Sequence, residues 1–219
     1  MNASGGPAYF ERIESETGFT PILARLLEAT PGAIGAALVD AEGEAVDYAG
    51  STIDPFDIKV AAATFRIIVQ EIELGPIGLR SGALKRLVIG TDERSYVIEV
   101  LPDGYALLTI LQQGANFGHA DRALDFALRD LYREAGWAAP PGLFRWHEIR
   151  VDADTEGRPV RVHTKDRAVP VHVIGKVAAG LRRTESGYRV GVTYGDCELT
   201  LVHALDEVWY ADLPSDAIK

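Results

Sequence analysis

Apolar residues recur at helical spacing in three stretches of the first 136 residues, which are 21–29, 55–74 and 117–135. Short apolar runs typical of strands lie between them, at 33–40, 44–49, 84–90, 95–101 and 105–111. The order is helix, two strands, helix, three strands and helix. It predicts an α+β fold, with a five-stranded antiparallel sheet and helices on both faces.

Two of the predicted strands are apolar on both faces. The run 33–40 reads AIGAALVD, and the run 105–111 reads YALLTIL. A strand covered on both faces lies inside a sheet, so we expect both runs to be inner strands. Local signals also predict helix caps, because Thr20, Asp54 and Asn116 each precede a helical run and carry a side chain that can accept a backbone hydrogen bond.

The helix predicted at 55–74 carries apolar residues on two opposite sides. The broad side consists of Ile58, Ala61, Ala62, Phe65, Ile68, Val69 and Ile72, and the second consists of Val60, Ala63, Ile67 and Leu74. One polar seam holds Lys59, Arg66, Gln70 and Glu73, and the other holds Thr64 and Glu71. A surface helix that is buried only against the core of its own domain has one apolar stripe. The second side therefore predicts another partner, which is either a further element of this chain or a second copy of it.

After residue 136 the helical periodicity ends. The segment 137–144 reads WAAPPGLF and is a predicted linker, because its paired prolines stiffen the chain and exclude helix. Six short apolar runs follow, at 148–151, 159–163, 169–177, 188–194, 197–203 and 208–211. They predict a small all-β domain over 145–219, either a barrel or an SH3-like fold. Residues 1–18 are rich in Gly and Ser and then acidic, and predict a flexible N-terminal extension.

Charge and composition narrow the possible partners. The formal net charge of −10 and the pI of about 5.0 disfavour binding to nucleic acid and to anionic membranes. We find no apolar run long enough to span a bilayer and no signal-peptide pattern, so we expect a cytoplasmic protein. The single cysteine, Cys197, excludes an intrachain disulfide. It falls in a predicted strand, where we expect a buried, inert thiol.

Motifs that indicate catalysis are absent from the sequence. There is no phosphate-binding GxxxxGK[ST] loop, no GxSxG elbow and no HExxH pair. The glycine-rich loop 75–82 leaves a helix and enters a strand, which is the reverse of the order in phosphate sites. We therefore predict a protein that is not an enzyme, with no catalytic residue, no cofactor and no bound metal.

Two weaker patterns in the last third of the chain leave alternatives open. His163, His172 and His203 could hold zinc if their strands adjoin, although scattered structural histidines are the favoured interpretation. Basic and aromatic residues could form a nucleic-acid surface, but this part of the chain is nearly neutral, so we favour protein binding or internal packing. These residues are Arg182, Arg183, Tyr188, Arg189, Tyr194 and Trp209.

Four stretches in the first part of the chain carry a family pattern. They are ILARLLEATPGAIGAALVDAEGEAV at 22–46, the Ala-rich helix after Asp54-Pro55, LKRLVIGT at 84–91 and DGYALLTILQQGANFG at 103–118. In sequence and order they resemble the Roadblock/LC7 family, the group of the dynein light chain and bacterial MglB-like proteins. The resemblance covers about residues 19–136 and implies two helices on one face of the sheet and the middle helix on the other. The acidic N-terminal extension and the added β-domain depart from the family pattern.

The resemblance also implies a partner surface. Family members dimerise by packing their middle helices together and joining their third strands edge to edge. Carried over to this chain, the implied dimer interface consists of Val60, Ala63, Ile67, Leu74, Leu84, Arg86 and Val88. The polar seam beside it and the loop after the helix supply our own candidates for binding another partner, which are Lys59, Arg66, Gln70 and Arg80. The implied function is a non-enzymatic homodimeric regulator or scaffold of a small Ras-like GTPase in bacteria. An arginine supplied in trans can stabilise charge during GTP hydrolysis, but we favour a structural role for Arg80.

Two other functions stay open at this point. One is a structural adaptor without a GTPase partner, which recruits protein or nucleic acid through the C-terminal β-domain. Deleting 141–219 would then abolish complex formation and leave the dimer intact. The other is a small-ligand sensor of the PAS or GAF type, which needs a roomy pocket. The small residues Ala33, Gly35, Ala36 and Ala37 favour close helix–sheet packing instead.

Overall fold

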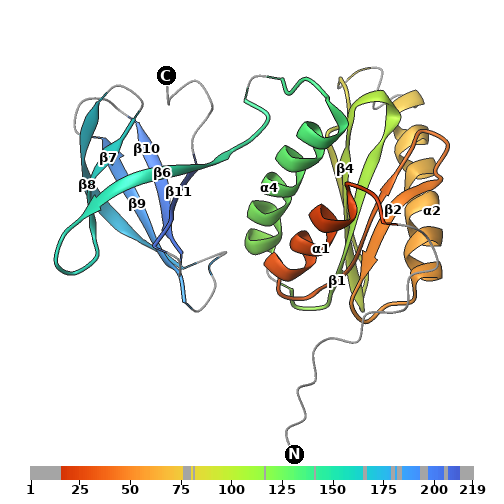
Figure 1. Cartoon of the computed structure of the whole chain (residues 1–219), viewed down its shortest axis with the longest axis horizontal. Helices are drawn as coiled ribbons and strands as arrows, with labels where there is room; N and C mark the ends of the chain where they lie inside the picture. The colour runs from red at the N-terminus through yellow and green to blue at the C-terminus, as the bar shows by residue number, and fades with distance from the viewer. Residues whose placement is uncertain are drawn as a thin grey trace, which may run out of the picture. The chain divides into compact units, whose positions relative to one another are not determined.

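The structure is a computed structural model, and it forms two compact units (Figure 1). One unit comprises Met1–Asn116 with Arg133–Trp137, and the other comprises Phe117–Tyr132 with Ala138–Lys219. The structure describes residues 16–75, 80, 82–115, 117–140, 142–164, 167–178, 181, 184–192, 197–204 and 207–212.

The first unit contains the five-stranded antiparallel sheet that the sequence predicts. Its elements are α1 (Thr20–Ala29), β1 (Ala33–Val39), β2 (Ala45–Gly50), α2 (Pro55–Leu74), β3 (Arg86–Gly90), β4 (Arg94–Val100), the short 3-10 helix η1 (Pro102–Gly104) and β5 (Ala106–Gln112). The strand order is β2-β1-β5-β4-β3. The two strands predicted to lie inside the sheet, β1 and β5, do so and are largely buried.

Helices α1 and α2 lie on opposite faces of this sheet (Figure 1). Helix α2 packs against β1, β2 and β5. It approaches closely because two strand positions lack a side chain: a Cβ at Gly50 would lie 2.8 Å from Cδ1 of Ile58, and one at Gly35 would lie 3.1 Å from the same atom. The close helix–sheet packing predicted from the small residues is therefore present.

The two helix caps that can be checked have different outcomes. Asp54 caps α2, since its Oδ1 accepts a hydrogen bond from the backbone N–H of Phe56 at 2.8 Å. The prediction for Thr20 is wrong, because the N-cap of α1 is Phe19 and no side chain caps it. The Thr20 hydroxyl instead donates to Oδ2 of Asp47 at 2.7 Å, where it compensates a fully buried carboxylate. Asn116 lies outside the described residues.

The second unit contains a closed six-stranded barrel and most of α4 (Phe117–Ala135). Its strands are β6 (Trp146–Ala153), β7 (Pro159–His163), β8 (Ala168–Val177), β9 (Ser186–Val192), β10 (Glu198–His203) and β11 (Trp209–Asp212), in the order β10-β11-β6-β7-β8-β9. Val190, Leu201 and Ala211 are fully buried at its centre. This confirms the predicted small β-domain, while its likeness to SH3 domains stays a prediction.

Helix α4 contacts the barrel through buried polar groups. Arg122 and Glu185 form an ion pair with an Nη2–Oε1 distance of 2.6 Å, and both side chains are more than nine-tenths buried. The carboxylate of Asp125 accepts hydrogen bonds from the backbone N–H groups of Arg145 and Trp146. The sequence-based boundaries, 19–136, 137–144 and 145–219, assign α4 to the first domain, whereas residues 117–132 form one compact unit with the barrel.

The structure also bears on the predictions for the cysteine and for membrane-spanning segments. Cys197 is exposed, so the prediction of a buried thiol is wrong. It lies one residue before β10 begins, at the end of the strand pair and outside the barrel core. None of the described helices is both long enough and apolar enough to cross a membrane.

Candidate functional site

Helix α2 has one buried and one exposed apolar side. Ile58, Ala62 and Val69 are buried against the sheet. On the outward side the exposed fractions are 70% for Phe56, 48% for Val60, 60% for Ile67 and 69% for Leu74. Single exposed apolar residues are normal on a protein surface, but a continuous row on one helix indicates an interaction surface.

The exposed row has the spacing of a coiled-coil seam. Its positions alternate steps of four and three residues along the helix, which keeps them on one face. The positions are Phe56, Val60, Ala63, Ile67, Gln70 and Leu74. We call this set the α2 seam. Phe56 was missed by the sequence analysis, although its place four residues before Val60 is a detectable signal. Helix pairs pack with such seams facing each other.

Strand β3 ends the sheet on the side away from β2. It pairs with β4 on one side and is the last strand in the order. Its exposure alternates, with Val88 about half exposed and Leu87 half-buried. Arg86 donates from Nε to the buried carboxylate of Glu99 on β4. Leu84, which precedes the strand, packs against the core cluster beneath α2.

Apolar contacts connect the helix to this edge of the sheet. The ring centroids of Phe65 on α2 and Tyr96 on β4 are 4.7 Å apart. Leu87 on β3 joins the same cluster, and all three side chains are only half-buried. The apolar surface therefore continues from α2 towards the end of the sheet at β3.

Several solved structures resemble the first part of this chain. A Roadblock/LC7 domain from Streptomyces avermitilis is 13% identical with a TM-score of 0.46, and the match covers 52% of this chain and 95% of that chain. The gliding protein MglB from Thermus thermophilus is 16% identical with a TM-score of 0.49, covering 54% and 89%. MglB from Myxococcus xanthus is 19% identical with a TM-score of 0.47, covering 55% and 96%.

The chain resembles Roadblock/LC7 and MglB structures over about half of its length. No family model matches the sequence, and no curated protein matches it.

The four candidate residues for partner binding differ in accessibility. Gln70 and Arg80 are exposed, and Lys59 is half-buried with its Nζ 4.7 Å from the centre of the Tyr48 ring. Arg66 is only 8% exposed. Its Nη1 lies 3.9 Å from Oε2 of Glu73, and its Nε and Nη1 make no hydrogen bond to the described residues. The structure thus places Gln70 and Arg80, but not Arg66, where another protein can reach them.

The three histidines considered for zinc lie on different strands and have different surroundings. His163 Nε2 is 2.9 Å from Oδ1 of Asp152, and His203 stacks on Trp209. His172 is exposed on β8, which is not a neighbour of β10, the strand that carries His203. Within the described part of the chain, no group of three or more His, Cys, Asp or Glu residues is arranged to hold a metal ion.

The aromatic residues considered for nucleic-acid stacking are inside the barrel. Tyr188 and Trp209 are each only 6% exposed and belong to the barrel core. Arg189 is paired with Glu198. Arg182, Arg183 and Tyr194 lie outside the described residues. Base stacking needs exposed rings, so these described residues do not offer a stacking platform.

Proposed function

We propose that this chain forms a homodimer through the α2 seam and the β3 edge, and that the dimer regulates or scaffolds a small Ras-like GTPase without catalysis of its own. The observation that carries the proposal is the exposed apolar seam of α2, and β3 adds the last strand of the sheet order as a second surface. The GTPase part rests on the resemblance to Roadblock/LC7 proteins.

A second copy of the chain suits this surface because the seam is uncharged and is apolar at every position except Gln70. The helix α2 of one protomer can lie antiparallel to that of its partner across a twofold axis, so that each seam contacts the same seam in the partner. Such an arrangement requires no complementary charges, and the seam contains none.

A comparison of free energies indicates that α2 and β3 must both contribute to the stability of the dimer. Burying the exposed part of four large apolar side chains on each protomer yields on the order of 10 kcal/mol. Association costs about 4–15 kcal/mol in lost translation and rotation. The two terms are comparable, so a stable dimer also needs the backbone hydrogen bonds that two β3 edges can form.

Charging the α2 seam tests the dimer. We expect Ile67→Glu to convert the dimer to a folded monomer, because two carboxylates would be buried without partners at the centre of the interface. Light scattering coupled to size-exclusion chromatography measures the mass, and circular dichroism checks the fold. Gln113→Glu is the matched control, since it adds the same charge at an exposed turn after β5. A natural chain that is monomeric at micromolar concentration would reject the dimer.

The GTPase partner is tested by pull-down with the natural dimer. Ras-like GTPases encoded in the same genome are loaded either with GDP or with a GTP analogue. We expect retention of one GTPase in one nucleotide state, weakened by Arg80→Ala, because Arg80 is exposed and lies outside the α2 seam. Equal absence of binding in both states rejects the GTPase part and leaves the dimer standing, because mass measurement tests the dimer separately.

A further inference from the structure

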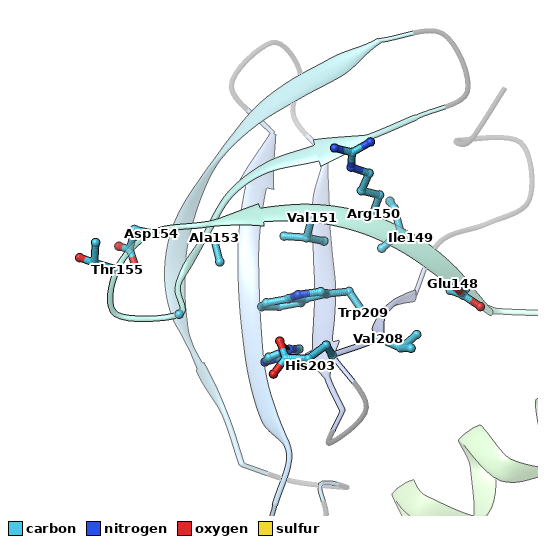
Figure 2. A pocket seen from close by; sticks show the side chains of 12 residues that line it. Glu148, Ile149, Arg150, Val151, Ala153, Asp154, Thr155, His203, Val208 and Trp209 are labelled. Atoms are coloured by element: carbon cyan, nitrogen blue, oxygen red, sulfur yellow. Dashed lines mark ion pairs between the residues drawn. The ribbon is translucent and has the colours of Figure 1, made fainter.

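A cavity of about 700 Å³ lies in the barrel and takes no part in the function proposed above. It is bounded by β6, by the turn after β6 and by His203, Glu207, Val208 and Trp209 at the facing ends of β10 and β11 (Figure 2). Small-molecule pockets in proteins commonly measure about 300–1,000 Å³. The cavity is therefore large enough for a small organic group.

The base of this cavity is aromatic. His203 on β10 and Trp209 on β11 are directly opposite each other in the strand pair. Their ring centroids are 4.4 Å apart and their planes differ by 12°, so the two rings are stacked. Ile149 and Val151 on β6 add apolar side chains to the lining. Trp209 is buried, whereas 26% of the His203 side chain is exposed.

The lining of the cavity is predominantly acidic. Asp154 and Glu207 contribute two carboxylates to the lining, whereas Glu148 and Arg150 alternate with Ile149 and Val151 along β6 and offset each other on its opposite face. A backbone hydrogen bond from Arg158 lowers the pKa of Asp154 below its usual value, so this carboxylate is ionised at neutral pH. The side chain of Arg150 points away from the stacked rings (Figure 2). The region beside the rings is therefore negative.

Glu207 brings a carboxylate to the stacked rings. Its backbone has a φ of 62°, which is uncommon for a residue other than glycine and concentrates at turns and functional sites. Its Oε2 lies 3.3 Å from Nε2 of His203, and that nitrogen makes no hydrogen bond to the described residues. The Glu207 side chain is 89% exposed, so the carboxylate is accessible from solvent.

We propose that this cavity binds an organic cation, namely a primary amine or guanidinium on an apolar stem. The stem lies along Ile149 and Val151, and the cation lies beside Glu207 next to His203, the more accessible ring of the stacked pair. Cations are attracted both to aromatic faces and to carboxylates. An anion of the same size would meet a surplus of negative charge. The same chemistry occurs in a lysine or arginine side chain of a partner and in a free diamine.

Tryptophan signals in an NMR titration test this proposal on the full chain. The chain has three tryptophans, Trp137, Trp146 and Trp209, and each contributes one indole N–H signal. We expect N-acetyl-lysine amide or cadaverine at millimolar concentration to shift only the Trp209 signal, with saturation, and glutarate to leave it unchanged. A response to the lysine derivative alone indicates a side chain of a partner, and a response to cadaverine indicates a free amine.

Two matched variants locate the binding. Glu207→Gln should weaken binding of the cation about tenfold, because it removes the accessible carboxylate. Glu156→Gln makes the same change at an exposed position in the turn after β6 that does not line the cavity, and should leave binding unchanged. The proposal is overturned if glutarate shifts Trp209 as strongly as the cations do, if neither cation shifts it, or if the two variants behave alike.

Discussion

Asp125 shows how one buried carboxylate joins α4 to the barrel. Its two oxygens accept hydrogen bonds from the backbone N–H of Arg145 at 2.8 Å and of Trp146 at 3.2 Å. Burial nevertheless raises its pKa above the usual 3.8, because the loss of hydration outweighs these hydrogen bonds and the nearby Arg129. The folded state therefore binds a proton at Asp125 more tightly than the unfolded state does.

The contribution of Asp125 to the free energy of unfolding depends on pH. An acid whose pKa is raised on folding contributes stability that is complete below its unfolded pKa and is lost as the pH rises through the folded value. We expect the free energy of unfolding of the natural chain, relative to Asp125→Asn, to increase as the pH falls from neutral towards 3.8. Urea unfolding at several pH values measures it.

Asp154→Asn is the control for this measurement, because its shift has the opposite sign. The pKa of Asp154 is lowered on folding, so its contribution is present above the usual pKa and is lost as the pH falls. The stability difference between the natural chain and each variant should therefore change with pH in opposite directions. If the stability differences of the two variants changed in the same direction with pH, this would contradict the assignment of the pKa shift at Asp125 to burial.

At the scale of elements, the position of α2 depends on two positions of the sheet that carry no side chain. Gly50 on β2 and Gly35 on β1 leave space that the side chain of Ile58 occupies. The helix therefore rests close to the sheet with one apolar side and presents the α2 seam outward. The distance between helix and sheet is a consequence of these two glycines.

Filling this space should destabilise the first unit. A Cβ at Gly50 would lie 2.8 Å from Cδ1 of Ile58 and 3.2 Å from the carbonyl oxygen of Ile53. We expect Gly50→Ala to lower the free energy of unfolding by about 1–3 kcal/mol, as overpacking does. Chemical denaturation measures it. Gly90→Ala on β3 is the control, because the nearest atom to its Cβ is 4.0 Å away. Equal stability of the two variants would refute the argument.

At the scale of the molecule, the two compact units are not two consecutive stretches of the chain. Residues 117–132 of α4 form one unit with the barrel, although the barrel begins after a proline-containing segment. The buried Arg122–Glu185 ion pair and the contact between the rings of Phe126 and Tyr210 connect them. The barrel is thus tied to a helix that the Roadblock/LC7 resemblance assigns to the first domain.

Breaking the ion pair tests this connection. Glu185→Ala leaves the guanidinium of Arg122 buried without this carboxylate, so we expect a loss of about 3–5 kcal/mol in the free energy of unfolding of the second unit. Glu198→Ala removes the partner of Arg189 at an exposed pair and should cost less than about 1 kcal/mol. Urea denaturation monitored by tryptophan fluorescence measures the free energy of unfolding of both variants. A similar loss in both variants would show that the connection contributes little.

The sequence by itself determined the helices, the strands and the two inner strands of the sheet, because these follow from local spacing of apolar residues. It also determined the two-sided character of α2, which needs only the helical period. The tertiary structure decided the burial of Arg66, the hydrogen bond from Thr20 to Asp47 and the stacking of His203 on Trp209. It likewise decided the exposure of Cys197 and the association of α4 with the barrel. These features depend on strand pairing and on contacts between residues far apart in the chain, and no local pattern encodes them.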